Sequence, residues 1–277
     1  MAPLESVFVW ITIFLYGIIS ALYIYSIVFR NEKVLGRAGY LVGVAFILHT
    51  AGILARYAAI GNLPVASDYE TGLGGSWVVV AFTLYVLLRH KSLRAVGVGT
   101  IPFSLLLLGF GLMREPVLVP MTASVRSFWL YIHVFFAWLA FGAYAVAAGL
   151  GIIYLLKEKH PDKEFYAKFP DFPKLDDLMF KYVVFGFVTD AVMIASGAIW
   201  AKDLWGNYWS WDPVETWSLV TWLIYGLAIH LRLTMGWKGR KMARLVIFAI
   251  SGMVITYFGI NFFVKTSLHF FQAWQEM

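Results

Sequence analysis

Residues 128–156 read FWLYIHVFFAWLAFGAYAVAAGLGIIYLL, a run of 29 residues without a single Asp, Glu, Lys or Arg. A helix needs about 20 mainly apolar residues to cross the hydrocarbon core of a bilayer. Apolar runs recur along the chain between charged breaks, so the sequence predicts an all-α, polytopic membrane helix bundle. We expect about eight transmembrane helices, at residues 7–29, 39–60, 76–88, 95–112, 128–156, 178–200, 216–235 and 245–264.

The composition supports a membrane protein. Of the 277 residues, 61% are hydrophobic and only 14% are charged, whereas soluble domains carry about 25% charged residues. The net charge of +6 comes from short loops between apolar runs, which indicates membrane lipid and no nucleic acid as partner. The chain has no cysteine, which excludes disulfides, iron–sulfur clusters and thiol chemistry of its own. We expect residues 1–277 to form a single membrane domain.

The basic residues predict the orientation of the bundle. Of the 22 Lys and Arg residues, 17 fall in loops on one side of the predicted spans. Basic residues accumulate in cytoplasmic loops, so we expect a protein of the cytoplasmic (inner) membrane with extracytoplasmic N- and C-termini. The five basic residues on or near the outer side are Arg56, Arg114, Arg126, Lys202 and Lys265.

Tryptophan is concentrated in residues 205–217, which read WGNYWSWDPVETW. We expect an outer loop at about 201–217, with Asp212 as N-cap and Pro213 at the first position of the next helix. Flat aromatic faces crowded into one segment suit a large planar apolar ligand. An interfacial aromatic belt is the alternative, because Trp also gathers at headgroup depth. The tryptophans concerned are Trp205, Trp209, Trp211, Trp217 and, further along, Trp222.

Four of the six histidines lie in or beside apolar spans: His49, His133, His230 and His269. Counted along the predicted helices, His49 and His230 lie in the inner half of the membrane, within about one turn of each other in depth. His133 and His269 lie at the outer surface. Each histidine alone can be a packing residue, but two pairs at two depths suit two bis-imidazole haem sites. A zinc site would need four ligands brought together, which this distribution does not favour.

Residues 205–217, continuing to Trp222 and to His230-Leu-Arg232, resemble the WWD domain of haem-handling membrane proteins. The Asp212-Pro213 step followed by Glu215-Thr216-Trp217 is most similar to the CcsA (ResC) family of System II cytochrome c biogenesis. Residues 61–70 also resemble the first outer loop of that family.

The resemblance implies haem b as ligand. It implies that His133 and His269 hold its iron at an outer site, and that His230 contributes to a second site within the membrane. His49 or a residue of a partner would complete the second site. The haem-contacting set would further include Trp205, Trp209, Trp211, Asp212, Trp217 and Trp222, with Asp212 equally suited to capping a helix. Arg56, Arg126 and Lys202 are candidates to pair with propionates, although a plain interfacial role fits them as well.

The activity implied is transport of haem to the extracytoplasmic side and its presentation to an apocytochrome c with a Cys-x-x-Cys-His motif. The family acts with a CcsB-type membrane protein, so we expect that partner, and we expect cytochrome c synthase activity only in the complex. No catalytic residue can be assigned. A CcmC-type protein that loads a haem chaperone is the nearest alternative. A small-solute transporter or a structural subunit of a respiratory complex represents a different class.

Overall fold

The computed structural model describes residues 1–114, 116 and 126–260, and all its regular elements are helices. In chain order they are α1 Pro3–Val28, α2 Glu32–Ile60, α3 Asp68–Arg89, a 3₁₀ segment η1 Lys91–Val96, α4 Gly97–Leu112, α5 Phe128–Lys159, α6 Glu164–Ala167, α7 Phe172–Trp205, α8 Pro213–Met235, α9 Arg240–Val254 and a π-helical end η2 Ile255–Gly259.

Eight helical spans in this part of the chain are long and apolar enough to cross a membrane, so the predicted all-α membrane fold is confirmed. Several helices are longer than the apolar runs suggest. α2 begins at Glu32, where the Asn31 side chain accepts a hydrogen bond from the Val34 amide, and not at residue 39. α7 runs to Trp205 and ends on Gly206 in the left-handed conformation. The helices extend past their apolar runs because capping residues, and not the change in hydropathy, end them.

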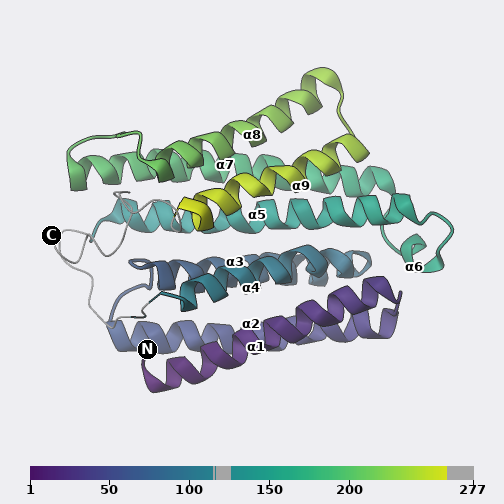
Figure 1. The fold of residues 1–277 in the computed structure, drawn as a ribbon, viewed down its shortest axis with the longest axis horizontal. Helices are drawn as coiled ribbons and strands as arrows, with labels where there is room; N and C mark the ends of the chain where they lie inside the picture. Colours follow the sequence, from purple (N-terminus) through teal and green to yellow (C-terminus); the bar gives the residue numbers. More distant parts are fainter. Residues whose placement is uncertain (115, 117–125, 261–277) are drawn as a thin grey trace.

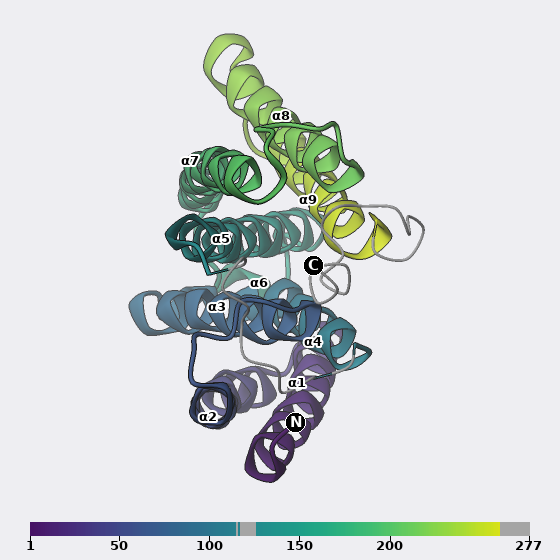
Figure 2. The same ribbon diagram turned by 90° about the vertical axis from the view of Figure 1, so that its left-hand side faces the viewer.

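The helices form a stack with α5 at its centre (Figures 1 and 2). α5 packs along α7, α3 and α9, while α1 and α2 lie on one side of the stack and α8 lies on the other. The N-terminus and the short connection at residues 206–212 lie at the same end of the bundle (Figure 1). We call this the loop end, and the end that carries α6 the α6 end.

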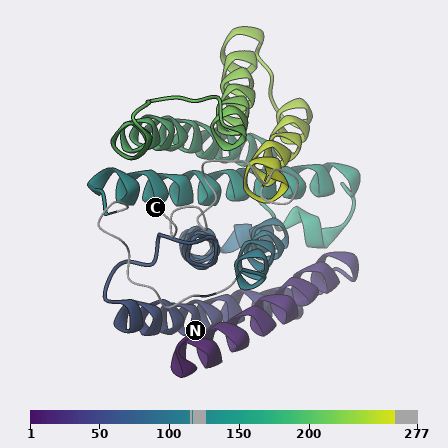
Figure 3. The same cartoon turned by 60° about the vertical axis from the view of Figure 1, so that its left-hand side comes forward.

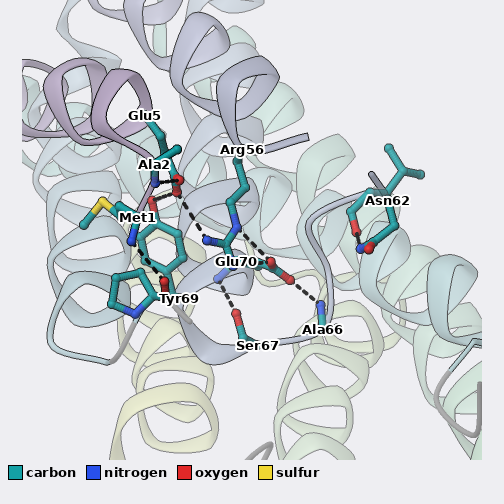
Figure 4. Close-up of polar contacts among 11 residues, drawn as sticks. Met1, Ala2, Glu5, Arg56, Asn62, Ala66, Ser67, Tyr69 and Glu70 are labelled. Atoms are coloured by element: carbon teal, nitrogen blue, oxygen red, sulfur yellow. Dashed lines mark hydrogen bonds and ion pairs between the residues drawn. The ribbon is translucent and has the colours of Figure 1, made fainter. Parts of the chain in front are cut away.

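A buried ion-pair network joins α1, α2 and α3 at the loop end (Figure 4). Arg56 donates two hydrogen bonds to Glu70 Oε1, at 2.7 and 3.0 Å, and its Nη1 lies 3.6 Å from Glu5 Oε1. The three side chains are at most 4% exposed. Glu70 also accepts a hydrogen bond from the Ala66 amide, which fixes the connection into α3. Arg56, an expected outer-side cation, is therefore neither interfacial nor available to a propionate, because two carboxylates already engage it.

A second network fastens the α6 end. Asp176 of α7 accepts hydrogen bonds from Arg232 of α8, at 2.5 Å, and from the Gly239 amide before α9, at 2.7 Å. The Arg232 guanidinium also lies over the Phe180 ring. One carboxylate thus holds the turn between α8 and α9 against α7.

Candidate functional site

A mostly apolar cavity of about 160 Å³ lies near the loop end of the bundle. α3, α5, α7, α8 and α9 with η2 contribute to its wall, together with Tyr208 and Trp209 of the 206–212 connection. The Tyr208 side chain is largely exposed, so the cavity reaches the surface beside this connection. Its polar side chains come from Asp68, Thr71, His133, Tyr144, Asp190, Tyr208, Glu215, Ser218, Thr221, Thr256 and Tyr257.

His133 lies in the cavity wall, where α5 faces α7. Its Nδ1 is 2.8 Å from the Met193 carbonyl oxygen, and its ring stacks on Trp200 with the centroids 6.3 Å apart. Because a carbonyl only accepts hydrogen bonds, Nδ1 must carry the proton, and Nε2 of the neutral imidazole therefore carries the lone pair. A histidine that ligates a metal is oriented by such a bond from its other nitrogen. The predicted axial ligand thus has the tautomer that metal ligation requires.

Two glycines of α7 make room for side chains of α5. A Cβ at Gly197 would lie 2.5 Å from His133 Nδ1, and a Cβ at Gly186 would collide with the Tyr144 ring. Both positions are in regular helix, so the requirement is for space and not for backbone freedom. The close approach of α5 and α7 that positions His133 and Tyr144 depends on these two residues.

Among the predicted tryptophans, only Trp209 contributes to the cavity wall as the structure describes it. Trp205 packs on Trp200, and Trp222 stacks on Phe187 with its Nε1 donating to the Phe187 carbonyl oxygen. Trp222 thus fastens α8 to α7, whereas Trp205 and Trp200 lie on the same helix. Trp217 is half-buried on α8 outside the cavity wall.

Trp211 points away from the bundle. Its side chain is 70% exposed, and its backbone has a φ of 60°, a left-handed conformation that is costly for a bulky residue. The connection between α7 and α8 therefore presents Trp209 to the cavity and Trp211 to the outside. The expected outer loop at 201–217 is also shorter, because residues 201–205 and 213–217 are helical.

Asp212 and Glu215 form a capping box at the start of α8. The Asp212 carboxylate accepts a hydrogen bond from the Val214 amide at 2.9 Å, and Pro213 occupies the first helical turn. Glu215 Oε2 accepts from the amides of Asp212 and Ser210. The predicted N-cap is confirmed. Asp212 lies outside the cavity wall, so the geometry assigns its carboxylate to the helix end.

The structure does not bring His49 and His230 together. α2 packs against α1 and α3, α8 packs against α7 and α9, and the two helices lie at opposite sides of the stack (Figures 2 and 3). The positions of the two histidines along their helices differ as well. Because α2 begins at Glu32, His49 lies 17 residues from that end and 11 from Ile60, whereas His230 lies five residues from the end of α8 at Met235.

The two histidines also differ in their surroundings. His49 is fully buried, and its Nδ1 lies 2.8 Å from the Tyr16 hydroxyl. His230 is exposed on the outer surface of α8, in line with Leu223 and Leu227. His269 lies outside the described residues, as does Lys265. In the described part of the chain, no three His, Asp or Glu side chains are arranged to hold a metal ion, and the chain has no Cys.

The cavity side chains that escaped the sequence prediction include Trp200, Tyr144 and Asp190. Trp200 and Tyr144 lie within apolar runs where nothing separates them from ordinary packing residues. Asp190 is different, because a carboxylate in the middle of an apolar span is rare and marks a functional position by default. That signal was available in the sequence.

The fold and the cavity together define a class: an all-helical, multi-pass membrane protein with a histidine- and tryptophan-lined cavity at one end of the bundle. Residues 71–268 match the family described as cytochrome C assembly protein. The chain is 31% identical over 265 residues to the cytochrome c biogenesis protein CcsA of Guillardia theta. This alignment covers 87% of each chain. It is 32% identical over 243 residues to CcsA of Chlamydomonas reinhardtii, in an alignment that covers 83% of this chain and 67% of the relative.

The fold is similar to that of a solved structure, the cytochrome c heme lyase CcmF, with a TM-score of 0.71 and 16% sequence identity. The alignment covers 93% of this chain but only 47% of the lyase chain, so this chain spans about half the length of that protein. At this identity the likeness concerns the fold alone.

The chain belongs to the cytochrome c assembly family and, within it, to the CcsA group of cytochrome c biogenesis proteins. Membership of this family implies that the protein handles haem. The eight apolar spans and the family agree on a multi-pass membrane protein.

Proposed function

We propose that the protein binds haem b in the cavity at the loop end and presents it, on the extracytoplasmic side, for covalent attachment to an apocytochrome c. The observation that carries this proposal is the geometry of His133. Its Nδ1 is bound to the Met193 carbonyl, so Nε2 is the nitrogen that can coordinate iron, and its ring lies against Trp200 in a cavity open to the surface. Haem is the cargo of this process and not a resident group.

The dimensions of the cavity fit presentation better than enclosure. Pockets that bury a whole drug-sized ligand have volumes of about 300–1,000 Å³, and this cavity has about 160 Å³. A porphyrin ligated by His133 would have only part of its ring among the apolar side chains. The rest would lie at the opening beside Tyr208 and Trp209, where the vinyl groups would be accessible to the thiols of a client. His269 is our candidate for the second axial ligand.

We propose that His230 belongs to a second haem site, shared with a CcsB-type partner. His230 lies on an exposed, otherwise apolar face of α8. A polar side chain that faces lipid is unfavourable and is usually covered by a partner or a ligand. The fully buried His49, on the far side of the stack, is not suited to supply the opposing ligand. We therefore assign the opposing ligand of this site to a residue of the partner.

The test of the outer site is the absorption spectrum of the purified protein and of its His133→Gly variant. We expect a Soret band in the wild-type protein, loss of most bound haem in the variant, and partial return of the band when imidazole is added, because free imidazole can occupy the vacated coordination position. The matched control is His160→Gly, which removes an imidazole that stacks on Tyr166 at the α6 end. Wild-type haem content in His133→Gly would rule out this site.

Attachment is distinguished from loading of a chaperone by reconstitution. Co-expression with a CcsB-type partner and a c-type client should yield haem covalently bound to the client, and omission of the partner should abolish it. Haem transfer to a soluble chaperone without covalent attachment would favour the CcmC-type alternative.

A further inference from the structure

Asp190 is a carboxylate in the interior of the bundle, near the middle of α7. Its side chain is 4% exposed and lies in the cavity wall. Its hydrogen-bond donor is Tyr144 of α5, whose hydroxyl oxygen is 3.1 Å from Asp190 Oδ2. The Tyr144 ring is stacked on Tyr225 of α8, with centroids 3.5 Å apart. Tyr144 therefore orients the carboxyl group, and Tyr225 packs against Tyr144.

The other carboxylates of the cavity wall have partners that account for them. Asp68 lies 3.6 Å from Arg114, and Glu215 accepts the backbone hydrogen bonds of the α8 capping box. No basic side chain in the described part of the chain forms an ion pair with Asp190. An ionised carboxylate in apolar surroundings is costly unless a positive charge lies nearby. The fold thus retains an acidic group whose balancing charge is not supplied by these residues.

Asp190 lies close to the residue that orients His133. It precedes Met193, whose carbonyl accepts the hydrogen bond from His133 Nδ1, by three residues, or about 4.5 Å along the helix axis. Residues 190, 193 and 197 follow the helical spacing of one face, and all three line the cavity. Whatever His133 ligates therefore lies within electrostatic reach of the carboxylate.

We propose that Asp190 is the counter-charge of the cavity and determines its specificity. It favours a metalloporphyrin whose metal centre carries a net positive charge over one whose centre is neutral. This inference rests on the proposed haem function and adds to it the charge of the preferred cargo. When a positively charged centre enters the cavity, its charge and the negative charge of the Asp190 carboxylate balance each other within the apolar wall.

The test compares two protoporphyrins that have the same ring and the same propionates, titrated into the purified full-length protein. Gallium(III) protoporphyrin has a positive centre, and zinc(II) protoporphyrin has a neutral one. We expect Asp190→Asn to lower the affinity for the gallium compound about tenfold, as for unit charges roughly 10 Å apart at an effective dielectric constant near 20. The affinity for the zinc compound should stay within about twofold, because no charge is balanced there.

Two further variants make the result specific. Asp203→Asn removes an exposed carboxylate near the loop end of the same helix and should leave both affinities unchanged. Tyr144→Phe removes the donor that orients Asp190 and leaves the carboxylate in place, and it should reduce the preference for gallium. This variant tests the inference even if Asp190→Asn folds poorly.

The outcomes are separable. Equal losses for both porphyrins in Asp190→Asn would indicate a structural role and overturn the inference, as would an unchanged preference for gallium. Wild-type protein that binds neither compound would overturn the proposed haem site and this inference with it. Binding of both compounds to wild-type protein, without any effect of Asp190→Asn, would overturn this inference alone.

Discussion

At the scale of the residue, the site depends on space as much as on ligands. The Gly197 position has no room for a side chain, because a Cβ there would lie 2.5 Å from His133 Nδ1 and 2.8 Å from Cε1. Contacts this short force the neighbouring group to move. The hydrogen bond that fixes the tautomer of His133 therefore depends on Gly197 of α7 having no side chain.

We predict that Gly197→Ala lowers bound haem several-fold. Overpacking of this kind costs about 1–3 kcal/mol, and the imidazole is the group that must shift. Gly43→Ala is the control, because nothing lies within 4 Å of a Cβ at Gly43. The measurement is the ratio of Soret to protein absorbance for each purified variant. Equal ratios in the two variants would mean that His133 tolerates displacement.

At the scale of the element, the start of α8 is defined by its cap. Asp212 and Glu215 satisfy the first amides of the helix and shape the connection that presents Trp209 to the cavity. We predict that Asp212→Ala destabilises the protein by about 1 kcal/mol, the usual value of an N-cap, and that Asp212→Asn is close to wild type. Thermal unfolding in detergent measures both. An Asn variant with wild-type stability that nevertheless loses haem would show that the carboxylate also contacts the ligand.

The buried and exposed ion pairs of α2 should differ strongly in their contribution to stability. Glu70→Ala removes the closer carboxylate from the buried Arg56, and we expect a loss of about 3–5 kcal/mol. Glu32→Ala breaks a pair with Lys168 in which both side chains are about half exposed, and we expect less than about 1 kcal/mol. Chemical unfolding of the two variants under identical conditions provides the comparison. Similar losses would mean that the network at the loop end is not a stabilising element.

At the scale of the whole molecule, the distribution of basic residues predicts that the loop end faces the extracytoplasmic side. Because the chain has no cysteine, single-cysteine variants have no background. We predict that Asn207→Cys, in the exposed connection before α8, reacts with a membrane-impermeant maleimide in intact cells. Lys163→Cys, exposed near α6, should react only after permeabilisation. The reverse pattern would invert the orientation and with it the side on which haem is presented.

Much of the fold follows from sequence because membrane helices are specified locally. A run of apolar residues must form a helix, since the bilayer leaves backbone groups no other partner. The eight spans and the start of α8 at Pro213 follow from residues close together in the chain. The start of α2 and both ends of α7 differ from the predicted spans, because capping residues, which hydropathy does not report, set the limits of a helix.

The class of the protein, the number of its spans and the family resemblance of residues 205–217 can all be read from the amino-acid sequence. Which side chains meet depends on the packing of the helices. It placed Trp209 in the cavity wall and Trp211 outside it, separated His49 from His230, engaged Arg56 with two glutamates, and brought His133 of α5 to the Met193 carbonyl of α7. Depth in a membrane can be counted along one helix. The order in which helices pack around α5 depends on contacts between residues far apart in sequence, and no local pattern contains it.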